Sequence, residues 1–414
     1  MNQAEQRHLA SILREYRERL ERARNELDPR LDETGFAVDP VAGEMLLVEA
    51  RMLDVENFML ADLEKRLRRQ RRRPLDRTRE LLRPRLGLLY QHSPRQLTVP
   101  ASYYTVNAPD PAPTISIVTP SYNQGHFVER TLYSVVSQSY PALQYVVQDG
   151  GSTDDTVEIL RRYEGSLTAW TSERDGGQAD AINRGFAKTS GEIMAYLNSD
   201  DLFLPGSLAF VARYFAEHPG VDVLYSHRLI IDGDDHHVGS WILPPHDSDE
   251  LTFVDYVPQE TLFWRRRIWE AAGGQIDASM HFALDWDLLL RMRAAGATMV
   301  RLPRFLGAFR AHDEQKTQTL EDLYLSEGAA LRQRVHGRAM SHDEAFLRAV
   351  PYLRRHVPRH LVHRARARWL PGRLHPVRTL PVEPWLRADR ATPKDAPAST
   401  PATATAPAQA EAAN

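Results

Sequence analysis

The sequence predicts an α/β protein, in which a mostly parallel sheet is flanked by helices and further helices extend the chain at both ends. Three observations support this prediction. Short apolar runs alternate with amphipathic helical patterns in the middle of the chain, two apolar stripes of helical spacing precede residue 86, and helical spacing returns after residue 320. A chain of 414 residues exceeds one typical domain, so we expect several parts.

The composition is that of a globular protein and excludes several classes. Hydrophobic residues make up 42% of the chain and charged residues 26%, which is enough to bury a full core. There is no cysteine, so any metal must be held by oxygen or imidazole ligands. A net charge of −3 argues against general nucleic-acid binding. Without a signal peptide or a membrane-spanning apolar run, the chain is expected to be cytoplasmic.

Residues 1–86 are expected to be helical and coiled-coil-like. Apolar residues recur at threes and fours over residues 9–27 and again over 45–63. This spacing predicts a buried face but not its partner, so a hairpin, a homo-oligomer and docking on the rest of the chain all stay open. The basic run at 65–73 is typical of a solvated face, then of contact with an anionic membrane surface, and least of nucleic-acid binding.

After a linker at 87–112, residues 113–320 carry the βαβ pattern of a parallel sheet. Right-handed crossovers place the carboxyl ends of its strands on one edge. Strands are expected at 115–119, 144–148, 167–171, 193–197 and 221–225, and helices at 128–138, 156–163, 178–188 and 207–217.

Four polar loops follow these strands, at the edge where open α/β sheets bind ligands. They are residues 120–123, 149–154, 175–178 and 198–201. The adjacent carboxylates of Asp200 and Asp201 suit a cation or a ligand hydroxyl, although an aspartate before a helix is also a common N-cap.

Asp149 is expected to be available to a ligand, because the glycines and hydroxyls after it are sufficient to make the turn and to cap the next helix. The sequence lacks both the glycine-rich dinucleotide fingerprint and the P-loop. A diphosphate would therefore need another counter-charge. A divalent metal, Mg²⁺ or Mn²⁺, on Asp200 or Asp201 would supply it.

Six motifs in this order resemble the family 2 inverting glycosyltransferases of the GT-A fold. They lie at residues 119–123, 148–154, 175–185, 197–201, 284–288 and 310–312, within about half of the chain. The resemblance implies transfer of a sugar, with inversion, from a nucleotide-diphosphate donor to a hydroxyl on a saccharide or lipid-linked acceptor. It also implies a UDP- or dTDP-linked donor and a place in envelope polysaccharide or glycan synthesis.

The resemblance further implies roles for single residues. Asp285 is similar to the catalytic base, and His312 to the histidine that completes a metal site with Asp200 and Asp201. The nucleotide-sugar contacts are expected to be Pro120, Tyr122, Asp149, Gln178, Asn183, Asn198 and Asp200.

Two positions depart from the family pattern. Asn198 replaces the first acid of the usual Asp-x-Asp, which weakens the expected metal site, and Leu284 precedes the base where an acid is common. Alternatives stay open for the other residues. Asp285 would also suit the N-cap of a helix at 286–293, and His312 a structural role. Asp287 is expected to be solvent-facing or structural, and the tryptophans 264, 269 and 286 to be core residues or sugar platforms.

Residues 321–385 are expected to form a helical basic extension, whose arginines over 354–368 resemble an interfacial helix. With the basic run at 65–73 they favour a peripheral position at the inner face of a membrane. The tail at 386–414 is Ala-, Pro- and Thr-rich and is expected to be disordered. The rival to an enzyme is a catalytically inactive glycan- or nucleotide-binding scaffold that oligomerises through its N-terminal helices.

Overall fold

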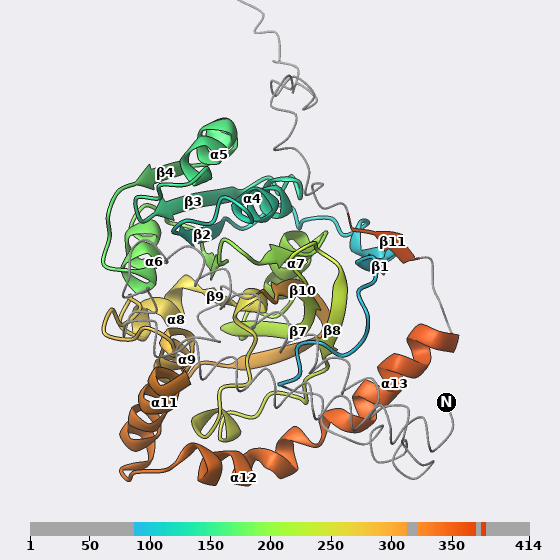
Figure 1. Ribbon diagram of the computed structural model, residues 1–414, viewed down its shortest axis with the longest axis vertical. Helices are drawn as coiled ribbons and strands as arrows, with labels where there is room; N and C mark the ends of the chain where they lie inside the picture. Colours follow the sequence, from blue (N-terminus) through green and yellow to red (C-terminus); the bar gives the residue numbers. More distant parts are fainter. Residues whose placement is uncertain (1–86, 313–320, 370–373, 378–414) are drawn as a thin grey trace, which may run out of the picture. The chain divides into compact units, whose positions relative to one another are not determined.

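The computed structural model describes residues 87–312, 321–369 and 374–377 (Figure 1). The chain divides into two units, Met1–Arg83 and Pro84–Asn414, and the described residues all belong to the second. The helices expected at 1–86, the basic run at 65–73 and the tail at 386–414 lie outside the described residues.

A nine-stranded sheet forms the centre of the second unit, in the order β4-β3-β2-β5-β9-β7-β10-β6, with β8 paired to β7. The predicted parallel sheet is confirmed: β2 lies parallel to β3 and β5, β3 to β4, and β7 to β10. The antiparallel strands β6, β8 and β9 were not predicted from the sequence. The bounds are β2 (Ile115–Ser121), β3 (Leu143–Asp149), β4 (Ala169–Ser172), β5 (Ile193–Tyr196), β6 (Leu202–Phe203), β7 (Val223–Ile231), β8 (His237–Trp241), β9 (Phe263–Arg265) and β10 (Met299–Arg310).

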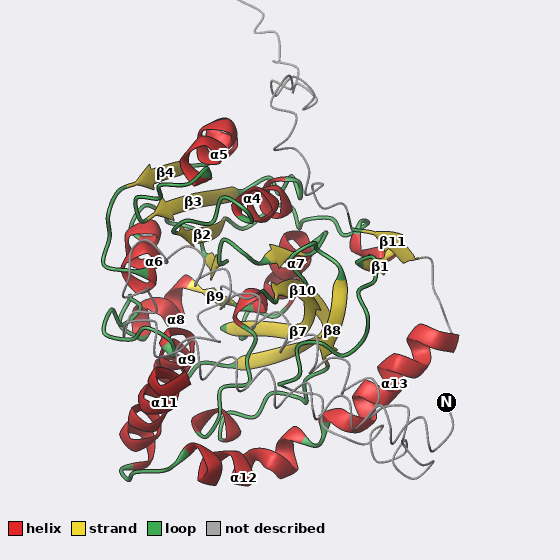
Figure 2. Cartoon of the chain, in the orientation of Figure 1, coloured by secondary structure: helices red, strands yellow, loops and turns green. Residues whose placement is uncertain are grey.

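Helices cover both faces of the sheet (Figure 2). Successive residues of β2 show why, because Ile117 packs in one apolar cluster and Val118 in the other. Apolar residues of α4, α5 and α7 join the first cluster, and those of α6, α8 and α9 join the second. The bounds are α4 (Val128–Val136), α5 (Thr156–Tyr163), α6 (Gln178–Phe186), α7 (Ser207–Glu217), α8 (Arg266–Ala271) and α9 (Leu284–Ala294).

The segment expected to be a linker, 87–112, is partly structured. It contains β1 (Thr98–Pro100) and the 3-10 turn η2 (Ala101–Tyr103). Leu97, Val99 and Tyr103 are buried in an apolar cluster with residues of β7 and β10. β1 also pairs antiparallel with β11 (Leu374–Pro376), so the two ends of the described unit meet in a small second sheet.

Within the extension expected to be helical, 321–385, the structure has α11 (Glu321–His336), α12 (His342–Leu353) and α13 (His356–Trp369), whereas β11 of the same range is a strand, so the expectation is wrong there. Ser341 caps α12 by accepting a hydrogen bond from the backbone N–H of Glu344. α11 and α12 bury Leu331, Ala345 and Ala349 in the same cluster as α9. Among the helices that the structure describes, none combines the length and apolarity needed to cross a bilayer.

Candidate active site

Contacts between the polar loops confirm that they meet at one edge of the sheet. The side chain of Asn123, after β2, accepts a hydrogen bond at 2.9 Å from the backbone N–H of Thr153, after β3. Gly150 lies so close to Asp175 and Tyr122 that a Cβ atom there would stand 3.3 Å from both side chains. The loops that follow β2, β3 and β4 therefore meet, as the convergence of strand ends predicted.

Asp149 is buried, and the loop after it uses both of its carboxylate oxygens. Oδ2 accepts hydrogen bonds from the backbone N–H groups of Gly151 and Ser152 and from the hydroxyl of Ser172, and Oδ1 accepts from the hydroxyl of Ser152. The expectation that the turn does not need Asp149 is therefore wrong. Its contact with a nucleoside stays a prediction.

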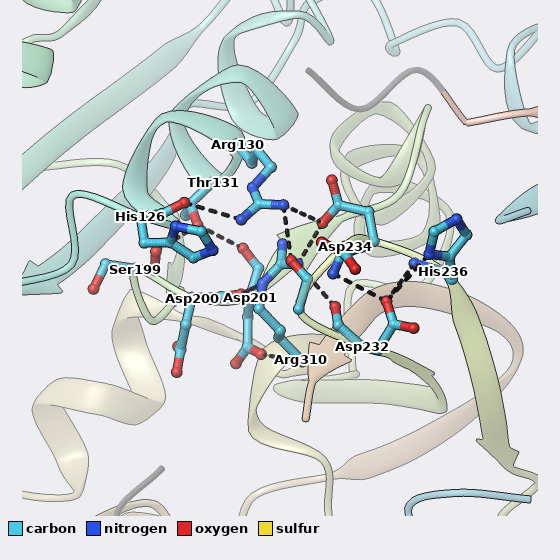
Figure 3. A network of polar contacts seen from close by, with 12 residues as sticks. His126, Arg130, Thr131, Ser199, Asp200, Asp201, Asp232, Asp234, His236 and Arg310 are labelled. Atoms are coloured by element: carbon cyan, nitrogen blue, oxygen red, sulfur yellow. Dashed lines mark hydrogen bonds and ion pairs between the residues drawn. The ribbon is translucent and has the colours of Figure 1, made fainter. Parts of the chain in front are cut away.

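Asp200 and His312 form a pair at this edge (Figure 3 shows Asp200 and its neighbours). Asp200 Oδ2 lies 3.2 Å from His312 Nε2, and both side chains are largely but not fully buried. The His312 ring packs against Phe127 with the ring centroids 4.5 Å apart, which holds the imidazole in place. The structure thus brings together two of the three expected metal ligands.

Asp201 points into the protein, with only 2% of the residue exposed. Its Oδ1 accepts a hydrogen bond from the backbone N–H of Arg310 at 2.9 Å. Burial and the neighbouring Asp200 raise the pKa of Asp201 well above its usual range. Neither aspartate caps α7, because the N-cap residue of that helix is Gly206. The N-cap interpretation of the pair is therefore wrong.

Two arginines lie behind these aspartates, a feature that the sequence analysis missed. Arg310 is fully buried and donates a hydrogen bond from Nε to the backbone carbonyl of Asp200 at 2.7 Å. Arg310 and Arg130 both form ion pairs with Asp235. Burial and the neighbouring Arg310 lower the pKa of Arg130. Arg310 belongs to the motif at 310–312, whose histidine alone was singled out.

Asp285 lies in the first turn of α9, and the N-cap residue of that helix is Ala283. Its Oδ1 accepts a hydrogen bond from the backbone N–H of Trp286 at 2.9 Å. The N-cap alternative is therefore wrong. The carboxylate of Glu327, from α11, instead binds the backbone N–H groups before the helix. Burial raises the pKa of Asp285 to about 6, which suits a base that works near neutral pH.

A second half-buried carboxylate, Asp255, accompanies Asp285 and was missed from the sequence. Burial and the charge of Asp285 raise the pKa of Asp255 well above its usual range. The guanidinium of Arg228 opposes this effect on both acids. Arg228 is itself held by a bidentate pair with the buried Glu260, at 3.0 and 2.8 Å. Asp255 lies in none of the six motifs, so no signal in the sequence singled it out.

Asp287 is fully buried, so the expectation of a solvent-facing side chain is wrong and the structural alternative holds. Its two oxygens pair with Arg291 at 2.8 Å and with Arg334, from α11, at 2.5 Å. The acid therefore ties α9 to the C-terminal helices. Helical spacing alone did not predict this, because the partner arginine lies 47 residues away.

The other expected site residues take varied positions. Pro120 is buried in β2, and Tyr122 is 63% exposed at the strand end. The amide of Asn183 binds both backbone groups of Ile276, at 2.9 and 2.8 Å, and so holds the loop before α9. Its donor contact stays a prediction. The three tryptophans lie in the apolar core, as the simpler interpretation predicted: Trp264, Trp269 and Trp286.

Gln178 and Asn198 are joined in a row of three amides. Gln178 Nε2 donates to Asn198 Oδ1 at 2.8 Å, and Asn198 Nδ2 donates to Gln259 Oε1 at 3.3 Å. Gln259 lies in the 3-10 turn η5 (Gln259–Thr261) and donates from Nε2 to the backbone carbonyl of Tyr196 at 2.7 Å. The row links α6, the end of β5 and η5.

Among the described residues, one further group has metal-ligating side chains close together: Asp232, Asp234 and His236, in the turn between β7 and β8 (Figure 3). Oδ1 of Asp232 accepts hydrogen bonds from the backbone N–H groups of Asp234 and His236. Those bonds explain the cluster as a turn, and Asp234 and His236 are exposed.

The fold and this edge define an α/β domain whose strand ends carry carboxylates, an imidazole and amides. Residues 116–271 match the family model described as glycosyl transferase family 2. This part of the chain belongs to that family. The match ends before Asp285 and His312.

Curated relatives are similar over parts of the chain. An uncharacterised glycosyltransferase of Mycobacterium tuberculosis is 43% identical over 93 residues, which cover 22% of this chain and 36% of that protein. The O-antigen biosynthesis protein RfbC of Myxococcus xanthus is 31% identical over 45% of this chain and 15% of its own length. A PGL/p-HBAD biosynthesis glycosyltransferase of Mycobacterium bovis is 28% identical over 46% and 73%. The chain thus spans about a third or less of the first curated relatives it matches.

Solved structures are similar at low identity. Residues 1–349 of TarS from S. aureus, in complex with UDP-GlcNAc, give a TM-score of 0.46 at 18% identity, covering 59% of this chain and 73% of that one. A mannosyltransferase from Pyrobaculum calidifontis, in complex with GDP-Man and Mn²⁺, gives 0.44 at 18% identity, covering 72% and 83%.

Proposed function

We propose that this protein is an inverting glycosyltransferase that moves a sugar from a nucleotide-diphosphate donor to an acceptor hydroxyl. The observation that carries the proposal is Asp285, a half-buried carboxylate whose pKa is raised to about 6. Asp285 and Asp201 both act on the pKa of the buried Tyr196 hydroxyl at the end of β5. A carboxylate with a raised pKa therefore lies close enough to the strand-end carboxylate Asp201 for both to act on one hydroxyl, which supports Asp285 as the base. Family membership supports the reaction class.

In the proposed reaction, Asp285 accepts the proton of the acceptor hydroxyl while that oxygen attacks the anomeric carbon. The new oxygen–carbon bond forms on the face opposite the bond that breaks, and the nucleoside diphosphate leaves with the electron pair. One displacement inverts the anomeric configuration and needs a single base. Pro120, Tyr122, Asp149, Gln178, Asn183, Asn198 and Asp200 are proposed to bind the donor.

The residues at 200 and 312 fit a divalent metal. A carboxylate oxygen and an imidazole nitrogen 3.2 Å apart are a donor set that Mn²⁺ or Mg²⁺ accepts, and donor phosphates would complete it. Asp201 fits less well, because Arg310 already occupies one of its oxygens. A bound metal would neutralise charge on the departing diphosphate.

Transfer assays test the reaction. UDP-, dTDP- and GDP-sugars, including UDP-GlcNAc and GDP-mannose, would be incubated with saccharide and lipid-linked acceptors, with Mn²⁺ or with a chelator. We expect turnover with at least one donor, loss of turnover on chelation, and an inverted anomeric proton by NMR. Nucleotide binding without turnover on any acceptor would favour the inactive scaffold instead.

Variants test the metal site. Asp200→Asn and His312→Ala should each weaken Mn²⁺ binding, measured by titration with the metal alone, by about tenfold or more, as loss of a ligand or its partner does. Asp234→Asn is the matched control from the turn between β7 and β8, and should bind Mn²⁺ normally. If only Asp234→Asn loses the metal, the site lies in that turn and the assignment to residues 200 and 312 is wrong.

The acceptor side of the proposal includes an anionic membrane surface. Helices α12 and α13 expose Leu347 at 71%, Phe346 at 46% and Val362 at 51%. Between residues 345 and 369 the chain has seven arginines and no acid. Arg354, the C-cap residue of α12, is exposed. Helices that combine exposed apolar side chains with an excess of arginine match a bilayer with anionic headgroups better than a neutral partner.

Flotation with liposomes tests this contact. Liposomes with anionic lipid should carry the protein, and 0.5 M salt or neutral lipid should release it, since the attraction is screened within about 10 Å at 0.1 M salt. Leu347→Glu combined with Arg354→Glu should abolish flotation, whereas Arg213→Glu, an exposed arginine of α7, should not. Equal recovery with both lipids, or binding to RNA in place of liposomes, would contradict the proposal.

A further inference from the structure

The direction of the amide row is fixed by its inner end. Tyr196 contributes a backbone carbonyl, which only accepts hydrogen bonds, so the Gln259 nitrogen must face it at 2.7 Å. Gln259 Oε1 is then the atom that faces Asn198, and it can only accept. Asn198 must therefore turn its nitrogen toward Gln259 and its oxygen toward Gln178. No other arrangement of the three amides keeps all three hydrogen bonds.

Position 198 is thus required to donate inward and to accept outward. An amide does both, whereas an ionised carboxylate only accepts. With an aspartate at 198, one of its oxygens would oppose Gln259 Oε1. Rotating the Gln259 amide would remove that conflict but would create the same conflict against the Tyr196 carbonyl. Gln259 is buried, so water cannot readily relieve either one.

We propose that Gln259 is a positioning residue that makes the donor site depend on a neutral amide at position 198. Through Asn198 it also orients Gln178, whose Oε1 forms the acceptor end of the row. In this arrangement the side-chain amides after β5 bind the hydroxyls of the donor. The carboxylate and the imidazole of the donor site then come from Asp200 and His312 alone. The functional part of this inference rests on the proposed donor site, whereas the stability part does not.

A double-mutant cycle tests the orientation. Asn198→Asp, Gln259→Met and the double variant are compared with the wild type by Tm at pH 8. Asn198→Asp should lower the Tm by about 2–4 °C or more in the wild-type background. Its effect should fall to less than half in the Gln259→Met background, where no oxygen opposes the new carboxylate. An equal effect in both backgrounds would overturn the proposal.

A second asparagine controls for the added charge. The Asn123 oxygen already accepts a hydrogen bond, from the backbone N–H of Thr153, so a carboxylate can replace it there without opposing another acceptor. Asn123→Asp should therefore show no comparable loss of Tm at pH 8. A loss as large as that of Asn198→Asp would assign the effect to the added charge and not to the direction of the amide row.

Nucleotide binding tests the positioning role. Gln259→Met should weaken the binding of UDP or GDP, whichever the wild type binds, by about tenfold, equivalent to about 1.4 kcal/mol. Gln138→Met is the matched control. Like Gln259, Gln138 accepts one hydrogen bond and donates one to a backbone carbonyl, but it accepts from the backbone N–H of Leu208 in α7 and not from another side-chain amide. It should lower the Tm without changing nucleotide affinity.

Two outcomes separate the inference from the proposed function. Unchanged nucleotide affinity in Gln259→Met would overturn the positioning role. If the wild type binds neither nucleotide, the proposed function fails, and the double-mutant cycle still decides the amide orientation. Should Asn198→Asp not fold, recovery of folding in the Gln259→Met background supports the orientation and failure in both backgrounds contradicts it.

Discussion

At the scale of single residues, burial decides the chemistry of the acids. Asp285 and Asp287 are two residues apart on α9. The carboxylate of Asp285 is half-buried and forms no ion pair with a described residue, whereas the carboxylate of Asp287 forms two. Burial outweighs the opposing charge of Arg228 and raises the pKa of Asp285 to about 6. Asp287, held between two arginines, acts as a structural anchor.

Asp285→Asn should reduce turnover by about 10² to 10⁴-fold, the usual contribution of a positioned base, with donor binding unchanged. In the wild type, kcat/KM should fall about tenfold per pH unit below the pKa of about 6, because the base is then protonated. Steady-state assays from pH 5 to 8 measure both effects. Asp249→Asn, whose carboxylate is exposed, is the control. A folded Asp285→Asn enzyme with near wild-type turnover would reject the assignment.

Asp287→Asn should destabilise the protein instead of stopping the chemistry. The change leaves Arg291 and Arg334 without their counter-charge, but both stay partly exposed and can take up water. We therefore expect a loss of about 1–3 kcal/mol, below the 3–5 kcal/mol typical of a broken, fully buried pair. Urea unfolding measures the loss. A stable variant without activity would instead move the base to position 287.

At the scale of elements, η5 is held between the sheet and the site. Glu260 binds Arg228 of β7, Gln259 binds the end of β5, and Gly307 of β10 lies against the backbone of η5. A Cβ atom on Gly307 would lie 2.3 Å from the Glu260 carbonyl oxygen, so any larger residue must displace the turn. The short turn therefore depends on three separate strands.

Gly307→Ala should lower the free energy of unfolding by about 1–3 kcal/mol or more, the usual cost of overpacking. It should also weaken nucleotide binding, because moving η5 moves Gln259 and hence Asn198. Urea unfolding and calorimetric titration measure the two effects. Gly220→Ala is the control, since a Cβ atom there meets nothing within 4 Å. Equal stability of both variants would show that η5 adapts without cost.

At the scale of the whole described unit, its first and last strands close the structure. β11 pairs with β1 in register, Val99 opposite His375, and the backbone N–H of Val377 donates to the Leu97 carbonyl at 2.9 Å. Tyr104 adds a hydrogen bond from its hydroxyl to the Pro376 carbonyl at 2.9 Å. These contacts cover β1, which in turn packs on β7 and β10 through its apolar side chains.

Deleting residues 374–414 should lower the free energy of unfolding by about 1–3 kcal/mol, because several backbone hydrogen bonds are lost at about 1 kcal/mol each. Deleting only residues 378–414 keeps β11 and is the matched control. Nucleotide binding should survive in both. Chemical denaturation of the two truncated chains compares them. The same loss in both would assign the effect to the tail and not to β11.

The sequence by itself determined the parallel core of the domain. Apolar runs of four to seven residues and amphipathic helices are local signals, so the strands β2 and β3 and the helices α5 and α7 lie where periodicity predicted them. The order of the polar loops at one edge followed from crossover handedness. Asp200, Asp285 and His312 were found because their motifs are short and occur in order, and their proposed roles await the experiments above.

Only the tertiary structure decided how those side chains are used. Asp201 turns inward toward a backbone N–H that lies 109 residues away, and Asp287 meets an arginine 47 residues away. Asp255, Arg228 and Gln259 gain their roles from neighbours on other elements: α9, η5 and β5. The antiparallel strands β6, β8 and β9 likewise depend on pairing with distant strands. Local sequence encodes periodicity and turn preference. Burial, pKa and hydrogen-bond direction depend on partners that are distant in the chain, and folding alone brings those partners together.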